Sequence, residues 1–344
     1  MLRNILRSTF TAILLTLTAC NLPFLMSEPT QPPVIPNDVP QSTSIPHNLT
    51  PANLPSERTN NAGDHDSSKS KDNQEAPGGD RFTFGQYERP FNANTMDTYF
   101  HELDIQDTQT FEDETWVYAT IQLKDRAGDE TLAGRYAMEI DNDLDGRGDW
   151  LILADHPASS TWTTEGVQVW MDSNEDVGGT SVISADEGKA PNDGFDLMVF
   201  DSGSGNDPDA AWTRVPEDIP NMVEIAVKRS LVINGSKYMV GMWAGSESLN
   251  PAMFDFNDHM THEQAGAAMR GFEIYYPIKA LAELDGSCRV AVGFQPNGSE
   301  PGLCPTYIPG APGEPPPPGG CPPNPNCGYG MNPDCSCVPP PPPR

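Results

Sequence analysis

Residues 136–154 read YAMEIDNDLDGRGDWLILA, an acidic loop between two strand-like segments. Tyr136, Met138 and Ile140 are apolar at alternate positions, which is the period of a half-buried strand. A second apolar run begins at Trp150, so the stretch predicts two strands joined by the loop 141–149.

The acidic loop has the D-x-D-x-D-G pattern of an EF-hand type calcium loop, with a glycine at the sharp turn. Hard cations such as Ca²⁺ prefer carboxylate and carbonyl oxygens. We therefore predict calcium as the cofactor. The expected ligands are the side chains of Asp141, Asp143 and Asp145, the carbonyl of Arg147, and Asp149 directly or through water.

Position 12 of the loop is Ile152, where an EF-hand has a bidentate glutamate. This departure is similar to dockerin-type and thrombospondin-type calcium loops, and it implies that an acid from elsewhere completes the site. A second loop, with Asp172, Asn174 and Asp176 in a D-x-N-x-D pattern, follows another strand. The alternative is a pair of acidic turns without an ion.

The rest of the chain predicts an all-β fold. Short alternating segments separated by Gly, Asp, Asn and Pro indicate one antiparallel β-sandwich over residues 81–308, with roughly ten strands. Two short connecting helices are expected at 261–268 and 278–284. Further strands are expected at 117–123, 167–171, 195–200, 223–227, 238–244, 272–276 and 289–294.

Two segments that flank the sandwich lack apolar periodicity. Residues 21–80 are rich in Pro, Ser, Asn and Thr, and such a composition buries too little surface to offset the entropy of ordering. We interpret them as a disordered tether. Residues 309–344 form a Pro-rich tail that contains cysteines.

The N-terminus has the features of an export signal. Arg3 and Arg7 precede an apolar run too short to span a membrane, and residues 17–20 read LTAC. This motif resembles the lipobox of bacterial lipoproteins, which implies that 1–20 is a lipoprotein signal peptide and that Cys20 carries the lipid. The expected location is the cell envelope, anchored to the membrane and facing outside the cytoplasm. An ordinary secretory signal is the alternative.

The net charge of the chain limits the kinds of partner that it can bind. Twenty Lys and Arg residues stand against 49 Asp and Glu, giving a net charge of −29. Such a field repels nucleic acid and attracts cations, so nucleic-acid binding is excluded.

The cysteines point to an oxidising compartment. Of seven cysteines, Cys20 is assigned to the lipid, and six remain as candidates for three disulfides. Cys288 and Cys304 would pair with each other, whereas the pairing within the tail stays open; a zinc site there and free thiols are the alternatives. The tail cysteines are Cys321, Cys327, Cys335 and Cys337.

Aromatic residues suggest a ligand. Trp116, Tyr118 and Trp170 fall on the strand face opposite the aliphatic positions, where exposed rings could stack on sugars, or alternatively close a second core layer. With its two acidic loops, the domain resembles calcium-associated β-sandwiches of the carbohydrate-binding or DOMON type on secreted bacterial proteins.

That resemblance implies a binding module more than an enzyme, and the sequence has no nucleophile elbow, H-E-x-x-H motif or phosphate-binding glycine loop. We therefore expect a non-catalytic, lipid-anchored, calcium-binding sandwich that binds an extracellular glycan or surface partner. The alternatives are a structural envelope protein in which calcium serves only folding, and a metal-assisted hydrolase.

Overall fold

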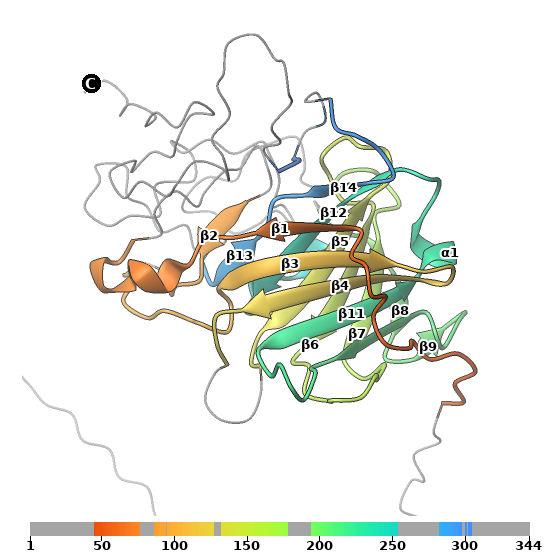
Figure 1. Cartoon of the computed structure of the whole chain (residues 1–344), viewed down its shortest axis with the longest axis horizontal. Coiled ribbons are helices and arrows are strands. Elements are labelled where there is room, and N and C mark those ends of the chain that lie inside the picture. The colour runs from red at the N-terminus through yellow and green to blue at the C-terminus, as the bar shows by residue number, and fades with distance from the viewer. Residues whose placement is uncertain are drawn as a thin grey trace, which may run out of the picture. The chain divides into compact units, whose positions relative to one another are not determined.

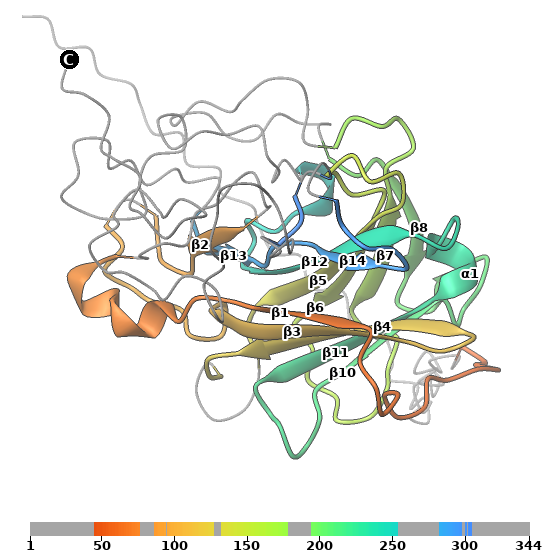
Figure 2. The ribbon, with the colours of Figure 1, turned by 45° about the horizontal axis from the view of Figure 1, so that its top comes forward.

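Two antiparallel sheets pack face to face, as the sequence predicted (Figures 1 and 2). The computed structural model describes residues 45–75, 86–93, 95–126, 132–177, 194–253, 282–297, 300 and 302–304. The first sheet has the strand order β1-β3-β4-β11-β10. These strands are β1 (Asn60–Gly63), β3 (Ile105–Glu112), β4 (Trp116–Leu123), β11 (Met222–Lys228) and β10 (Ala211–Arg214).

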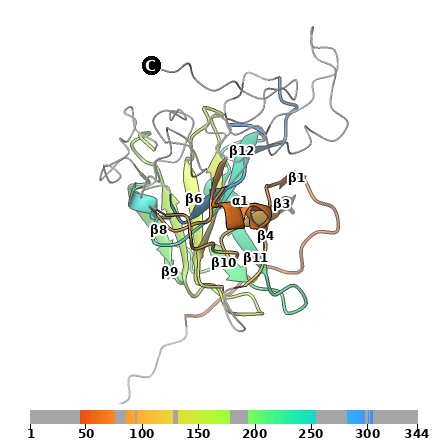
Figure 3. The same ribbon diagram turned by 90° about the vertical axis from the view of Figure 1, so that its left-hand side faces the viewer.

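The second sheet has the order β2-β13-β12-β5-β6-β7-β8-β9, with β14 also paired to β12. Figure 3 shows the sandwich from the side, with β8 and β9 in one layer and β3 and β4 in the other. The strands are β2 (Tyr87–Arg89), β13 (Leu284–Gly286), β12 (Tyr238–Gly245), β5 (Arg135–Asp141), β6 (Trp150–Asp155), β7 (Val167–Met171), β8 (Leu197–Asp201), β9 (Ser204–Gly205) and β14 (Val290–Val292).

The core lies between the sheets and follows the period of two. Val117, Ala119 and Ile121 of β4 point inward from the first sheet, and Met138 and Ile140 of β5 point inward from the second; all are fully buried. Complete burial of a large aliphatic side chain contributes about 1.5 to 3 kcal/mol, so this layer drives the packing of the two sheets.

Helices are few in the described part of the chain, and each has three or four residues; none has the length and apolar character that a membrane span requires. The predicted helix 261–268 and strand 272–276 lie outside the described residues. The predicted helix 278–284 is described only at its end, where Leu284 begins β13, so its boundary was wrong. The helices are η1 (Ser67–Lys69), η2 (Lys71–Asn73), α1 (Arg229–Val232) and η4 (Pro251–Met253).

The ordered domain begins earlier than the sequence predicted. Residues 45–75, assigned to the disordered tether, belong to the same unit as the sandwich, and β1 extends the first sheet by pairing with β3. Asp209 holds the segment before β1, because its carboxylate accepts hydrogen bonds from the backbone N–H groups of Asn48 and Leu49, each at 2.9 Å. Polar contacts replace the apolar periodicity here, which is why the composition was misleading.

Two of the three aromatic residues proposed as a sugar platform are buried. Trp116 and Tyr118 pack with Phe111 and Trp212 in a second apolar cluster on the outer face of the first sheet. Leu54, from the N-terminal segment, packs against it. The predicted ligand role for this pair is therefore wrong, since the early residues cover the face that was expected to be open.

The predicted pairing of Cys288 with Cys304 is confirmed. The disulfide joins residues 16 apart, with their Cα atoms 4.9 Å apart, and it ties the start of β14 to the end of the described chain. The four tail cysteines lie outside the described residues, and their pairing stays a prediction.

Replacing both Cys288 and Cys304 by alanine should lower the free energy of unfolding by about 3 kcal/mol, because the bond restricts the unfolded chain over a short loop. Denaturant unfolding without reductant measures the change against the wild type. Equal midpoints and slopes for the two proteins would show that the bond does not contribute to stability.

Candidate metal centre

The loop 141–149 connects β5 to β6, whose pairing runs from Arg135 opposite Asp155 to Ile140 opposite Trp150. Asp149 donates its backbone N–H to the carbonyl of Ile140 at 2.8 Å, which closes the loop at its base. The two strands thus hold the ends of the loop at a fixed separation, and its acidic residues project from one end of the second sheet.

Carboxylates organise the loop by accepting its backbone N–H groups. Asp141 accepts from Leu144 at 2.6 Å through Oδ1 and from Gly146 at 2.8 Å through Oδ2. Asp149 accepts from Asn142 at 2.6 Å. The backbone therefore bends around the acidic side chains, and this arrangement holds their oxygens toward the inside of the turn.

Three of the five predicted ligands come together. Asp141, Asp143 and Asp149 each offer one carboxylate oxygen, and these atoms lie within 4.8 Å of one another. Calcium binds oxygen at about 2.3 to 2.6 Å, so a single ion can reach all three. Asp145 lies outside this group, and its Oδ1 accepts the N–H of Arg147 at 2.9 Å. The sequence predicted that an acid from another segment would complete the site. Among the described residues, no carboxylate from another segment joins these three.

Two residues of the loop have a left-handed backbone conformation. Gly146 has a φ of 90°, which confirms the turn expected at this glycine, and Leu144 has a φ of 68°. That conformation is costly for leucine. Leu144 packs against an apolar cluster that contains Met239, Ala291 and Leu303, and this contact helps to fix the loop.

A buried ion pair lies beneath the loop. Glu139 accepts hydrogen bonds from Nη2 of Arg289 at 2.8 Å and from Nε1 of Trp243 at 2.7 Å, and both charged side chains are 1% exposed. Gly148 lies directly above, where a Cβ atom would come within 2.6 Å of Glu139 Oε1. The close approach requires glycine and brings the loop onto the charged pair.

Burial makes the loop carboxyl groups costly to ionise. It raises the pKa of Asp141 to about 7, against the opposing effect of the Arg289 charge, and it also raises the pKa values of Asp145 and Asp149. A bound cation favours the ionised carboxylates, since opposite charge lowers a carboxyl pKa. The oxygen donors, their proximity and their desolvation all fit a hard cation such as Ca²⁺.

The second acidic loop lies beside the first, because β6 and β7 are neighbours. The backbone N–H of Asp172 donates to the carbonyl of Asp149 at 2.9 Å. The Asp172 carboxylate accepts from the backbone of Glu175 and Val177, each at 2.9 Å, and Asn174 donates to Asp176 at 3.0 Å. These contacts close the turn on itself. No group of three acidic ligands forms here among residues 171–177.

The third predicted aromatic ligand, Trp170, is half-buried at the end of β7, and its Nε1 donates to Gln168 at 3.0 Å. Met198 lies opposite Trp170 on β8 and is 43% exposed. The neighbouring Leu197 is 45% exposed. Trp170 therefore borders an exposed apolar edge next to the second acidic loop.

One further acidic group was missed in the sequence. Asp64, Glu88 and Asp285 bring one oxygen each within 4.8 Å of the others. They belong to segments far apart along the chain, so no local spacing could reveal them.

Comparison of the chain with family models, with curated proteins and with solved structures found no match.

Calcium should raise the melting temperature, because an ion that binds only the folded state stabilises it by RT ln(1 + [Ca²⁺]/Kd). Asp143→Ala should remove the part of this shift that the loop 141–149 contributes. Asp143 is exposed and its carboxylate accepts a long hydrogen bond, 3.2 Å, from the N–H of Asp145, so the folded state should tolerate the change.

Asp218→Ala, at another exposed acid, is the matched control for loss of one negative charge. Thermal unfolding with calcium and with excess chelator gives the comparison. If the wild type melts at the same temperature in both, the loop does not bind calcium with useful affinity.

Proposed function

We propose that this chain is an exported, lipid-anchored β-sandwich that binds calcium through the loop 141–149 and has no catalytic role. The observation that carries the proposal is the convergence of Asp141, Asp143 and Asp149 within 4.8 Å, on a loop whose backbone is already bent around its carboxylates. A preorganised loop loses little conformational entropy when the ion binds, which favours affinity.

The ligand in this proposal is an extracellular glycan, and a surface protein is the alternative partner. Support comes from Trp170 and Met198, which lie directly opposite each other on β7 and β8, so that a half-buried ring lies beside an exposed apolar side chain at this edge. Aromatic faces stack on the apolar faces of sugar rings. The second acidic loop follows Trp170 directly and is hydrogen-bonded to the first loop, so calcium in the first loop would stabilise the backbone that carries this edge.

A structural envelope protein, with calcium serving folding alone, is the second candidate. The burial of Trp116 and Tyr118 favours it, because these rings contribute to a core layer and offer no open face to a sugar. The two candidates differ in whether Trp170 has a ligand.

Trp170→Ala should abolish binding to a glycan array. It should leave the calcium-dependent melting shift intact, because Trp170 is not one of the residues that bind the ion in the loop 141–149. Trp162→Ala is a matched control, since Trp162 is also half-buried but packs against the second apolar cluster, with Arg214 4.6 Å from its ring centroid. Loss of binding in Trp170→Ala alone supports the glycan proposal. Absence of any binding by the wild type favours the structural candidate.

The anchor in the proposal is Cys20, at the end of the LTAC motif and outside the described residues. The wild type should partition with membranes and carry lipid on Cys20, whereas Cys20→Ser should not acquire lipid. Mass spectrometry of the N-terminal peptide tests this. An unmodified Cys20 in the mature protein would contradict the lipoprotein assignment.

A further inference from the structure

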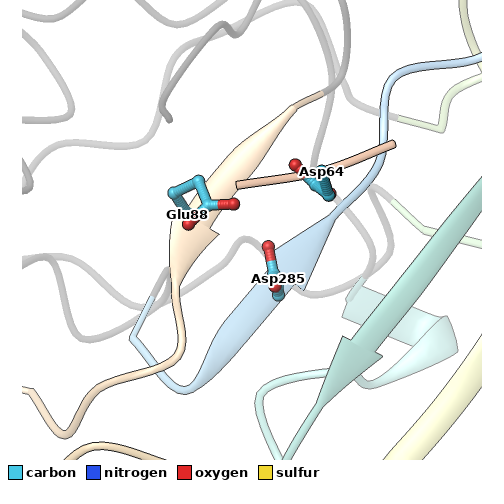
Figure 4. Close-up of side chains that lie close together, drawn as sticks. All are labelled: Asp64, Glu88 and Asp285. Carbon is cyan, nitrogen blue, oxygen red and sulfur yellow. The ribbon is translucent and has the colours of Figure 1, made fainter. Parts of the chain in front are cut away.

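Asp64, Glu88 and Asp285 form a second acidic cluster, in which the three carboxyl groups turn toward one another (Figure 4). Asp64 directly follows β1 of the first sheet. Glu88 and Asp285 are the central residues of β2 and β13 in the second sheet, and they are directly opposite each other across this strand pair. The cluster therefore joins the two sheets at one end of the sandwich.

Like charges at directly opposed positions destabilise a sheet, so this arrangement needs compensation. Glu88 and Asp285 are fully buried. Moving an ionised carboxylate out of water is expensive unless an opposite charge or a set of hydrogen bonds replaces the water.

Hydrogen bonds supply only part of the compensation that these carboxylates require. Asp285 Oδ2 accepts the backbone N–H of Ile105 at 2.6 Å. Asp64 Oδ1 accepts from Gln86 Nε2 at 2.8 Å and from the N–H of His65 at 2.9 Å. Ser67 Oγ donates to Glu88 Oε2 at 2.5 Å. Each of the three side chains thus accepts at least one hydrogen bond.

The second oxygens of two members receive no hydrogen bond from an N–H or hydroxyl group of the described residues. Asp64 Oδ2 and Asp285 Oδ1 are buried, and neither has a hydrogen-bond partner in the described part of the chain. No lysine, arginine or histidine among the described residues forms an ion pair with Asp64 or Asp285 either. A fully buried carboxylate that directs an unpartnered oxygen into an acidic cluster is the arrangement of a metal ligand.

Burial and mutual repulsion act in the same direction on these groups. Burial, reinforced by the charge of Asp285, raises the pKa of Glu88 well above its ordinary value, and burial raises the pKa of Asp64 to about 7. The local electrostatic environment therefore favours a positive charge between the carboxylates.

We propose that Asp64, Glu88 and Asp285 bind a hard divalent cation, at a site separate from the loop 141–149. The donors are all carboxylate oxygens, and their separation of at most 4.8 Å lets one ion reach all three. Because Glu88 and Asp285 are fully buried and Asp64 is half-buried, the ion serves a structural role. It holds the end of β1 against β2 and β13, while Asp285 also holds the first residue of β3.

Metal content after equilibrium dialysis tests the site. The full chain is dialysed against Ca²⁺, Mg²⁺ or Mn²⁺ in separate experiments, and bound metal is measured by mass spectrometry. Asp285→Asn should bind one equivalent less than the wild type of at least one of these ions. The asparagine can still accept the hydrogen bond from Ile105, so the strand contact is kept.

Asp104→Asn is the matched control. Asp104 is also fully buried and lies near the cluster, but it is outside the three ligands and is satisfied by Tyr99 and by Gln106 Nε2 at 2.6 Å. The Asp104→Asn variant should bind as many equivalents of each metal ion as the wild type. Circular dichroism confirms folding, and Glu88→Gln replaces Asp285→Asn if the latter does not fold.

Asp143→Ala tests the loop 141–149 separately. A result against calcium binding by the loop can therefore be told apart from a result against the buried site. If both sites bind, the two substitutions lose metal additively. In the Asp143→Ala background, a chelator should then increase proteolysis between Asn60 and Arg89 at least several-fold, since only the buried ion remains there to be removed. A folded Asp285→Asn or Glu88→Gln variant that keeps the wild-type content of all three ions would overturn the proposal.

Discussion

The buried ion pair between Glu139 and Arg289 is the interaction on which the acidic end of the sandwich depends. Glu139 lies in β5, two residues before the loop, and Arg289 lies between Cys288 of the disulfide and the first residue of β14. Breaking a buried pair by removing one partner typically costs about 3 to 5 kcal/mol, because the other charge remains buried. The pair therefore couples the position of the loop to the position of the last strand.

Buried acidic groups are compensated in different ways in this sandwich. Glu139 has a guanidinium and an indole N–H, whereas Asp141 has two backbone N–H groups and the nearby charge of Arg289. Asp285 has one backbone N–H and an oxygen without a partner among the described residues. Asp285 therefore has the least compensation of these three buried carboxyl groups from the described residues.

Local patterns in the sequence predicted local structure well. The alternation around Met138, the acidic loop and the apolar run from Trp150 correspond closely to β5, the turn and β6. Central strands with one face in the core have a clear period of two, and the first loop brings three of its predicted ligands together because they are neighbours along the chain.

Long-range contacts could not be predicted in this way. The order of residues 45–75 depends on Asp209 and on pairing with β3, and the burial of Trp116 depends on that same segment. Asp64 and Asp285 belong to one cluster only because β1 and β13 meet in space. Spacing rules cannot reveal any of these features, since the partners are far apart along the chain.

The pairing of β2 with β13 also determines when the domain can fold. Ile105 and Asp285, which are hydrogen-bonded, are 180 residues apart in sequence, and Tyr87 pairs with Gly286. Closing so long a loop carries an entropic cost before any contact offsets it, and a high contact order slows folding. During synthesis, β13, which pairs with β2 in the described part of the chain, becomes available only after residues 284–286 have left the ribosome. The second sheet therefore completes only after β13 is available, so the edge that carries β2 forms late in folding.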